Sequence, residues 1–426
     1  MQDLKITDAY TLKPLLDGKA LAKALNTPPG PWMKEALEVV MAWQLRNPDV
    51  KDPQQAIGEV EKGRAASAAA AAGGELSSSL AKHFLKLTIQ PLFLKARSGR
   101  VTNTGRKVAG EQLPKKLTAE NTDDEVSRPW EKDAYALDLL RWVVSVLDEK
   151  MVEGVWHLVI PPLLTLIDDW ETKYKRLGAE LLAHVLAVTS PTLLERTGLA
   201  EVFEEALTPC LSYLPELTPE DESVELLSAV YPVLITLAKV RYPLEPTVGS
   251  KISKEHSTRE RIKQLDSIIR KGVIYSYSHC SEYPRLVSLL FDQLALLCTE
   301  LGLESVKHLR FILPMLNETL ASRILADATQ RHRQTLVSAV KAMQAVILNA
   351  WPKMPEYKLE VLKGLTLCWL NLDGKSGDDV AQVREETKTT VQMLRAALGS
   401  SAEFKDECRL LVDIDERLSE MLTAGT

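Results

Sequence analysis

The sequence predicts an all-α protein built as a helical-repeat array, and three observations support this. Apolar residues recur at helical spacing in one segment after another from residue 130 to the end. No run alternates apolar and polar residues for long enough to form a strand, and only 6% of the residues are aromatic. At 426 residues the chain is long for one compact domain, which favours an elongated array.

Residues 155–186 form the clearest unit. A first apolar stripe ends at Asp168 and Asp169, and a second follows after a short polar break. The two stripes are Trp156, Val159, Ile160, Leu163, Leu164 and Ile167, then Leu177, Leu181, Leu182, Val185 and Leu186. The pattern predicts a helical hairpin that resembles a HEAT repeat, with prolines in the first helix and a basic pair early in the second. Because one hairpin cannot bury its stripes alone, neighbours must stack on both sides.

Further amphipathic helices are expected along residues 130–426. The expected ranges are 139–147, 199–207, 224–240, 284–301, 305–320, 334–351 and 357–370, with breaks at 242–257 and 373–379. Their spacing drifts from one hairpin to the next. The prediction is therefore an irregular HEAT-like α-solenoid, an ARM-type superhelix, over residues 130–426.

The first 129 residues divide into two expected parts. Residues 1–50 predict a small helical segment, interrupted by the Pro-Pro-Gly-Pro break at 28–31. Residues 51–129 are expected to be a low-complexity and basic linker, mostly disordered, with one amphipathic helix within 77–95. Its basic stretch, 95–116, is either a tether for nucleic acid or an acidic partner, or a solvated insertion without a ligand. The second interpretation is favoured because the acidic residues at 121–127 nearly cancel the basic charge.

Composition restricts the function classes. A net charge of −6 gives no overall drive toward nucleic acid or anionic lipid. Five scattered cysteines without a CxxC pair favour a reduced compartment, cytoplasmic or nuclear. We expect no secretory signal and no membrane span, since no apolar stretch reaches about 18 residues.

No catalytic or metal-binding motif stands out. The seven histidines never form HExxH, and neither a GxSxG turn nor a glycine-rich phosphate loop occurs. The sequence therefore predicts a protein that is not an enzyme and that holds no metal or cofactor.

Polar residues around the hairpin turn are candidates for partner binding. Asp168 and Asp169, with Lys173, Lys175 and Arg176, could form a ridge that a partner contacts. The alternative is an internal ladder, in which turn carboxylates pair with basic residues of the same or the next repeat. This alternative is favoured, because HEAT hairpins commonly use these positions in that way.

Three residues near the ends of later helices are further candidates. Trp351, Pro352 and Trp369 could be binding hot spots if exposed, but core positions between repeats are favoured. The basic segment 251–271 could dock an acidic partner, and a solvated helix face is the favoured alternative.

Residues 12–48 resemble the C-terminal tail of eukaryotic, especially fungal, tRNA nucleotidyltransferases, the CCA-adding enzymes. The likeness is carried by the Asp17-Gly18-Lys19 turn, by PGPWM at 29–33 and by AWQLRNP at 42–48. In that family the catalytic head lies far upstream, whereas only eleven residues precede the match here. The resemblance implies a detached tail, and the function that remains open on this basis is tRNA binding.

Four later stretches, in order, resemble the TELO-two-interacting protein two (Tti-two) family over about residues 130–372. They are IPPLLTLIDD at 160–169, GLAEVFEEAL with LPELTPEDES at 198–223, LGLESVKHLRFILPML at 301–316, and NAWPKM with LKGLTLCWLNL at 349–372. The resemblance implies a HEAT-like, non-catalytic subunit of the Tel–Tti–Tti (TTT) co-chaperone complex.

That family membership implies specific partners. They are the Tti-one and Tel-two subunits, the heat-shock chaperone machinery and the phosphatidylinositol-3-kinase-related kinases, which include TOR and DNA-damage checkpoint kinases. A HEAT-like scaffold of some other complex is the remaining alternative.

Overall fold

The computed structural model describes residues 15–24, 32–46, 53–94, 100–102, 105–107, 128–133, 135–245, 253–327, 330–399 and 401–423. Over these ranges helices follow one another, and an antiparallel bridge between Val101 and Lys107 is the one extended pairing described. The predicted all-α class is confirmed, whereas the HEAT repeat type stays a prediction. The chain forms two compact units, Met1–His83 and Phe84–Thr426.

The first unit contains α1 (Gly18–Ala24), α2 (Trp32–Arg46) and most of α3 (Pro53–Phe84). The Asp17 carboxylate accepts a hydrogen bond from the Ala20 N–H at 2.7 Å and so begins α1. A small core joins the three helices and consists of Leu16, Leu21, Ala36, Val40, Ala56, Ile57 and Val60. The expected helical segment is therefore a packed cluster that also uses the start of α3.

Residues 53–94 differ from the mostly disordered linker that the sequence predicts. The 32-residue α3 runs through the alanine-rich stretch, and η3 (Leu85–Ile89) and α4 (Gln90–Leu94) continue it. Alanine has the highest helix propensity, so a low-complexity alanine run can be regular helix. Most of the other residues of the expected linker lie outside the described ranges, and the division at residues 50 and 129 stays a prediction.

The second unit is a stack of helical hairpins that opens with two short helices. α5 (Pro129–Lys132) and α6 (Tyr135–Ser145) pack beside η3 and α4, and the rings of Phe93 and Trp130 stack with centroids 4.8 Å apart. Five hairpins follow in the described part of the chain. The first pairs α7 (Glu149–Asp168) with α8 (Thr172–Ala187), and the second pairs α10 (Leu199–Leu207) with α11 (Glu220–Arg241). In the third, α12 (Lys254–Ile268), η5 (Ile269–Ile274) and α13 (Tyr275–Cys280) together pair with α14 (Pro284–Leu301); the fourth pairs α15 (Leu309–Leu320) with α17 (Gln330–Asn349), and the fifth pairs α18 (Met354–Asn371) with α19 (Asp378–Ala397). The shorter segments are α9 (Pro191–Thr197), η4 (Thr208–Ser212), η6 (Gly302–His308), α16 (Arg323–Asp327), η7 (Trp351–Lys353), α20 (Ala402–Ile414), η8 (Glu416–Leu418) and α21 (Ser419–Thr423).

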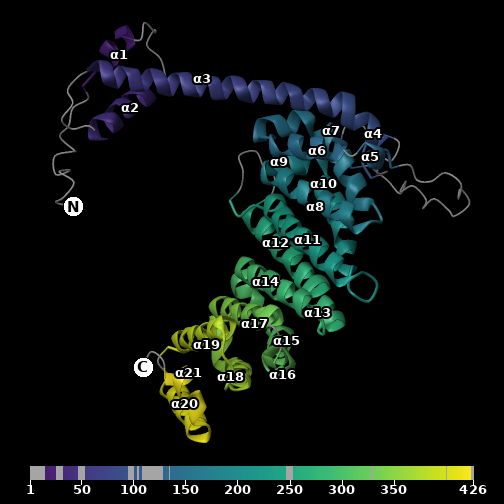
Figure 1. The fold of residues 1–426 in the computed structure, drawn as a ribbon, viewed down its shortest axis with the longest axis vertical. Coiled ribbons are helices and arrows are strands. Elements are labelled where there is room, and N and C mark those ends of the chain that lie inside the picture. Colours follow the sequence, from purple (N-terminus) through teal and green to yellow (C-terminus); the bar gives the residue numbers. More distant parts are fainter. Residues whose placement is uncertain are drawn as a thin grey trace, which may run out of the picture. The chain divides into compact units, whose positions relative to one another are not determined.

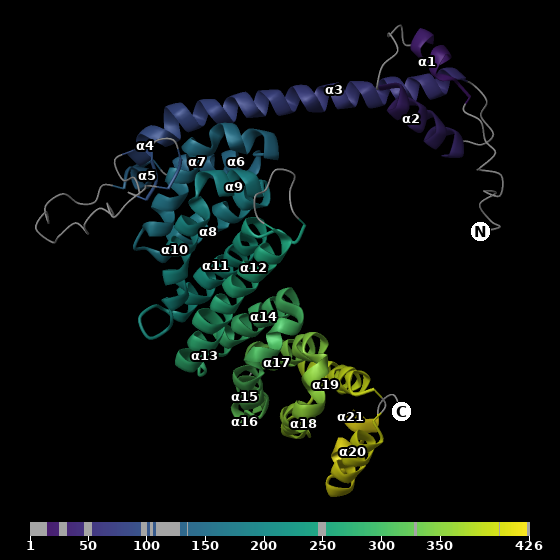
Figure 2. The same cartoon turned by 180° about the vertical axis from the view of Figure 1, so that it is seen from behind.

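The hairpins form two layers, which can be followed in Figure 1 and, from behind, in Figure 2. The second helices, α8, α11, α14, α17 and α19, lie side by side in one layer. Four contacts join the N-terminal ends of neighbouring helices in this layer: Arg176–Glu225, Arg285–Asp221, Thr335–Pro284 and Arg333–Asp379. The second helices therefore run parallel to one another. The first helices form the other layer. There the hydroxyl groups of Tyr277 in α13 and Thr319 in α15 form a hydrogen bond, and the Asn317 side-chain amide of α15 donates a hydrogen bond to the Glu360 carbonyl of α18.

This arrangement gives the stack two edges with different connections. We call the end where the two helices of each hairpin join the turn edge; it includes residues 169–171, 213–219, 281–283 and 372–377. We call the end where successive hairpins join the far edge; it includes residues 188–190, 302–308 and 350–353. The predicted hairpin at 155–186 is confirmed, with its turn on the turn edge.

Within the part of the chain that the structure describes, three helical stretches are long and apolar enough to cross a membrane: Glu149–Asp168, Glu220–Arg241 and Pro284–Leu320. A bent pair, Thr172–Ala187 with Pro191–Thr197, passes the same test together. The expectation that no apolar stretch would reach this length is therefore wrong. Burial on several sides explains the first stretch, of whose apolar window 78% is buried inside the protein; the windows of the second and third stretches are 56% and 50% buried. A helix covered by neighbours in both layers needs little polar surface.

Candidate functional site

The turn between α7 and α8 is held by an arginine from outside the hairpin. Arg128 Nη2 donates to Asp169 Oδ1 at 2.6 Å, and Arg128 Nη1 donates to Glu131 Oε1 at 2.9 Å and to Glu171. The Arg128 side chain is only 7% exposed. Its guanidinium also lies 4.5 Å from the ring centroid of Trp170. One buried cation thus fixes three consecutive turn residues.

The electrostatics of this turn are those of a buried ion-pair network. Burial lowers the pKa of Arg128, but hydrogen bonds to Glu171 and Glu131 outweigh it, so the net pKa lies above the ordinary arginine value. Hydrogen bonds from Lys173 and Arg128 lower the pKa of Glu171. Burial raises the pKa of Asp169, while the Glu171 N–H, which donates to Asp169 Oδ1 at 2.8 Å, and the Arg128 charge oppose the rise. Removing the cation would leave carboxylates in a site that solvates them poorly.

Three of the five predicted turn residues are engaged inside the protein. Asp169 pairs with Arg128, and Asp168 lies 3.4 Å from the Arg100 guanidinium. The buried Lys175 Nζ donates to the Ile167 carbonyl at 2.8 Å, which satisfies a carbonyl in the last turn of α7. All three side chains are engaged within the chain, but not as the predicted ladder has it, because the cations that pair with Asp168 and Asp169 precede the hairpin and Lys175 binds a backbone carbonyl. A partner-binding role for the three residues stays a prediction.

The other two predicted turn residues, Lys173 and Arg176, lie at the surface beside a pocket of about 510 Å³. Trp170, Lys173 and Arg176 line one side, and Leu217, Glu222 and Glu225 line the other. Two large apolar side chains are exposed to solvent at this pocket: Trp170 is 73% exposed and Leu217 is 93% exposed. We call this site the Trp170–Leu217 pocket. It lies on the turn edge, between the first two hairpins.

Leu217 points outward because of the turn that precedes α11. The N–H groups of Leu217 and Thr218 both donate to the Leu214 carbonyl at 3.0 Å, and Leu214 itself is buried. The chain therefore turns back at Leu214. Leu217 stays in solvent ahead of Pro219, the N-cap residue of α11.

The structure does not bring the predicted tryptophans to this pocket. Trp369 is 2% exposed, and its indole N–H donates to the Arg417 carbonyl at 2.9 Å, so its predicted core position is confirmed. Trp351 is 55% exposed, and its neighbour Pro352 is exposed too, on the far edge. The favoured core position is wrong for Trp351 and for Pro352, because the short 3₁₀ turn η7 carries both beyond the last helical turn of α17, where their side chains are exposed.

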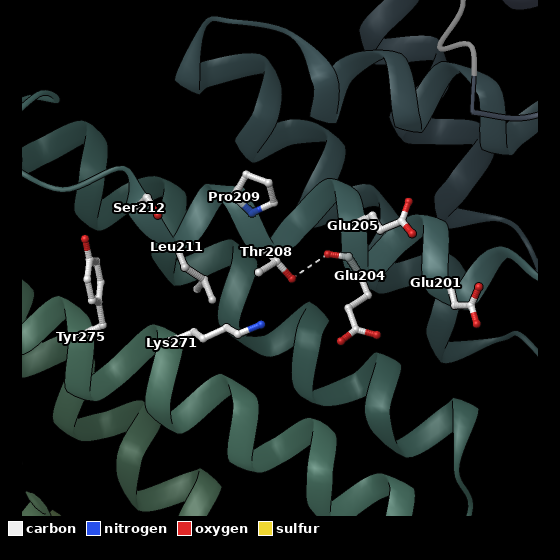
Figure 3. Close-up of a pocket in the computed structure, with 9 residues that line it drawn as sticks. All are labelled: Glu201, Glu204, Glu205, Thr208, Pro209, Leu211, Ser212, Lys271 and Tyr275. Atoms are coloured by element: carbon white, nitrogen blue, oxygen red, sulfur yellow. Dashed lines mark hydrogen bonds between the residues drawn. The ribbon is translucent and has the colours of Figure 1, made fainter. Parts of the chain in front are cut away.

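A larger groove of about 710 Å³ crosses the layer of first helices (Figure 3). Glu201, Glu204 and Glu205 of α10 line one wall, and Lys271 and Tyr275 lie across from them. The glutamates already have cationic neighbours within the chain: Lys107 Nζ lies 2.6 Å from Glu201 and 3.9 Å from Glu205, and Arg241 lies 3.1 Å from Glu204. The groove is polar and largely charge-compensated.

The basic segments that the sequence singled out also pair inside the chain. Arg100 and Lys107, from the basic stretch, contact α7 and α10, and the Trp156 indole donates to the Gly105 carbonyl at 3.2 Å. In the segment 251–271, Arg261 is buried and lies 2.5 Å from Glu300. The rest of this segment agrees with the favoured solvated helix face, since Lys254, Arg259, Lys263, Arg270 and Lys271 are exposed. For the basic stretch 95–116, the choice between a tether and a solvated insertion stays a prediction. Residues 251–252 and most of 95–116 lie outside the described ranges.

Sequence reasoning missed Arg128, Trp170 and Leu217. Arg128 directly precedes α5 and lies 41 positions from Asp169, so no local pattern points to the contact. The spacing gives no signal for Trp170 either, because it stands three residues after Ile167 and so continues the first apolar stripe. Within the described residues, no group of three or more His, Cys, Asp or Glu side chains could hold a metal ion.

Comparisons with known proteins find two kinds of relative. The Tti2 family model matches residues 61–325. Mouse TELO2-interacting protein 2 is 21% identical over 286 residues, which are 67% of this chain and 48% of that protein. The nucleotidyltransferase lcsQ of Purpureocillium lilacinum is 56% identical over 62 residues, and the tRNA nucleotidyltransferase cca2 of Schizosaccharomyces pombe is 40% identical over 47 residues. These two matches cover 15% and 11% of this chain, and 10% of each nucleotidyltransferase. No solved structure matches the chain.

The matches bear out both resemblances and correct one boundary. The chain spans about half the length of the mouse relative and about a tenth of each nucleotidyltransferase. The family match begins at residue 61, inside α3, rather than near residue 130, and it ends at residue 325. It covers the Arg128 network and the Trp170–Leu217 pocket, along with well over half of the chain. The chain belongs to the Tti2 family.

Proposed function

We propose that the chain acts by binding alone, as a scaffold subunit of the Tel–Tti–Tti co-chaperone complex that supports the maturation and stability of phosphatidylinositol-3-kinase-related kinases. The observation that carries this is the family match over residues 61–325, which includes most of the helical stack. The mouse relative is named for its interaction with TELO2. A stack of hairpins offers a long continuous surface, which suits an adaptor that holds other elongated subunits.

The strongly perturbed thiols support a role without catalysis. Burial raises the pKa of Cys298 and of Cys368 to about 12, and both thiols lie in the core. A nucleophilic cysteine needs a lowered pKa and access to substrate. These cysteines are therefore small core residues, which also suits a reduced compartment.

The proposal names partners and a place. The direct partners are the Tti-one and Tel-two subunits, and through them the heat-shock chaperones and the large kinases of TOR and checkpoint signalling. The site of action is the cytoplasm, the nucleus or both. The proposal includes no cofactor, no membrane and no nucleic acid for the helical stack.

The test is affinity purification of the tagged full-length chain from its own cells, followed by mass spectrometry. We expect Tti-one, Tel-two and large kinases in the eluate, and lower steady-state levels of those kinases when the chain is depleted. A correctly folded chain that enriches neither Tti-one nor Tel-two would contradict the proposal.

A second candidate function applies to the first unit only. The short matches at 56% and 40% identity to nucleotidyltransferases favour a tRNA-linked role for it. Electrophoretic mobility shift of tRNA with the full-length chain tests this role, and phosphate contacts predict binding that weakens steeply as salt rises. If no shift occurs even at low salt, the first unit does not bind tRNA.

A further inference from the structure

We infer that the groove of Figure 3 binds a cationic segment of a partner protein, and that residues 100–102 and 105–107 of this chain occupy one end of that site as an internal ligand. We call these residues the basic latch, and we call Glu201, Glu204 and Glu205 of α10 the acidic wall. The inference goes beyond the proposed function and does not depend on it. It is carried by contacts that the chain makes with itself.

The first argument is that the acidic wall already binds basic side chains from a distant part of the sequence. Lys107 Nζ lies 2.6 Å from Glu201, 94 positions away, and 3.9 Å from Glu205. Arg100 Nη1 also lies 3.9 Å from Glu205. The hydrogen bond from Lys107 lowers the pKa of Glu201, which favours the charged carboxylate. Cations are therefore the groups that this wall recognises.

The second argument is that the neighbouring helices also recognise the backbone of the latch. The Trp156 indole N–H of α7 donates to the Gly105 carbonyl at 3.2 Å. The Lys107 N–H donates to the carbonyl of Thr197, the last residue of α9, at 3.2 Å. Gly105 has a φ of +69°, and a Cβ there would lie 2.9 Å from His157 Cα. The site therefore selects a cation close to a glycine in a left-handed turn.

The third argument is that the latch is held by contacts that a partner can replace. The side chains of its two wall-binding cations remain partly exposed, at 27% for Arg100 and 39% for Lys107. Val101 is the one buried side chain among the described residues of the latch. Exposed ion pairs are individually weak and are screened by salt. Cations of another chain can therefore compete with the latch.

The fourth argument is that the groove is larger than the part that the latch reaches. The described contacts of the latch with the wall are to Glu201 and Glu205, whereas the groove of about 710 Å³ continues to Lys271 and Tyr275 (Figure 3). Both described cationic neighbours of Glu205 belong to the latch. Release of the latch would leave this carboxylate open to a partner, and Tyr275, at 49% exposure, would be available to a neighbouring apolar side chain.

The latch also determines when a partner binds. Because it belongs to the same chain, it competes at an effective concentration on the order of millimolar. A cationic segment of ordinary affinity therefore reaches the wall only after the latch has been weakened or released.

The experiment measures binding of a fluorescently labelled peptide of residues 97–110 to the full-length chain by anisotropy. This peptide, RSGRVTNTGRKVAG, supplies the latch as a separate molecule with four basic residues and no acidic one. The wild-type chain is compared with the double variant Arg100→Gln, Lys107→Gln. We expect the double variant to bind the peptide about tenfold more tightly, because its internal competitor has lost the two cations that contact the wall.

Substitutions in the wall test where the peptide binds. In the double variant, further Glu201→Gln and Glu205→Gln changes should weaken peptide binding about tenfold. Glu153→Gln is the matched control and should change binding less than about twofold, since Glu153 is an exposed carboxylate of α7 that pairs with Arg196 and does not line the groove. Thermal unfolding of each variant verifies that the fold is retained.

Two further readouts test the chemistry of recognition. A peptide that carries Gly105→Ala should bind about tenfold more weakly, because a Cβ at this position meets the α7 backbone. The affinity of the unmodified peptide should fall between low salt and about 0.5 M salt, since the ion pairs are exposed. Binding that is independent of salt would overturn the inference, as would equal binding of the two peptides.

Three other results would also overturn it. Equal affinity of the wild type and the double variant would mean that the latch does not compete for the groove. Absence of binding to both chains would mean that the latch is a fixed part of the fold. Unchanged affinity after replacement of Glu201 and Glu205 would place the peptide elsewhere on the molecule. None of these results bears on the proposed function, which is tested by co-purification.

Discussion

The turn edge and the far edge of the helical stack each contain a cluster of ion pairs, with opposite charges at the centre. Each buries charge where helices meet. On the turn edge one cation, Arg128, is surrounded by the carboxylates of Asp169 and Glu171. On the far edge one carboxylate, Glu300, is surrounded by the cations of Lys239 and Arg261. Both clusters join elements far apart in the chain and therefore fix how neighbouring hairpins sit.

Each edge also exposes a tryptophan, and here the edges differ. Trp170 lies under a fixed guanidinium and beside a second exposed apolar residue, Leu217. Over the described residues, no aromatic ring or cation stacks on Trp351. The comparison teaches that exposure alone does not make an anchor, because a binding residue also needs support that holds it still.

Removing the central cation of the turn edge should give the largest effect. Arg128→Ala leaves Asp169, whose side chain is 6% exposed, as an uncompensated buried charge, and we expect a loss of about 3–5 kcal/mol in the free energy of unfolding. Urea denaturation measures this loss. Arg141→Ala is the control, since Arg141 is exposed and pairs with Asp138, which is exposed too, and it should cost less than about 1 kcal/mol. Equal small losses in the two variants would mean that the network does not hold the turn.

Replacing a buried tryptophan and replacing an exposed one should change the free energy of unfolding by very different amounts, and this is the next largest effect. Trp369→Ala removes a side chain that is 2% exposed, near the turn edge, and we expect it to cost about 3–5 kcal/mol through the cavity it leaves. Trp351→Ala, on the far edge, should change stability by no more than about 0.5 kcal/mol. Thermal unfolding monitored by circular dichroism compares the two. A comparable loss in both would show that the far edge is covered in the folded protein.

Two glycines of the first hairpin, one near each edge, should respond oppositely to replacement by alanine, with a smaller change in stability. A Cβ at Gly178 would lie 2.9 Å from the Ile167 nitrogen and 3.0 Å from Leu166 Cβ, so Gly178→Ala should push α7 and α8 apart near the turn edge and cost about 1–3 kcal/mol. Gly154 lies toward the other end of α7, and a Cβ there meets nothing within 4 Å. Gly154→Ala should therefore stabilise the protein by about 0.5–1 kcal/mol. Chemical denaturation of the two variants should give opposite signs, and a gain in Gly178→Ala would refute the close crossing.

The smallest expected effect is a pH dependence of protein stability that arises from Glu300 on the far edge. Burial raises the pKa of Glu300, but hydrogen bonds from Lys239 and Arg261 outweigh it, and the net pKa lies below the ordinary value of 4.5. Between the two pKa values the native state binds fewer protons than the unfolded state. The stability that Glu300 contributes is therefore present above about pH 4.5 and is lost as the pH falls through its folded pKa.

The corresponding variant is Glu300→Gln. Urea unfolding between about pH 6 and pH 3 should show that the wild type loses more stability on acidification than the variant does. Parallel curves for the two proteins would mean that Lys239 and Arg261 do not favour the charged carboxylate.

Local sequence patterns determined most of the architecture. Helical spacing of apolar residues predicted the all-α class and the hairpin at 155–186, because an amphipathic stripe depends only on residues three and four apart. The same pattern placed Trp369 in the core. The order of four motifs indicated the family, whose match covers residues 61–325. The alanine run of α3 is an exception: its low complexity predicts disorder, whereas alanine favours helix and the structure has helix there.

Tertiary structure alone decided the candidate site. Arg128 meets Asp169 and Glu171 across 41 and 43 positions, and no local pattern encodes a contact between a segment and a turn so far along the chain. The exposure of Trp170, Leu217 and Trp351 likewise depends on which helix ends are covered by a neighbour. Periodicity tells which face of a helix is buried, but at helix ends and turns there is no face to read. The side chains that a partner could contact stand at those ends.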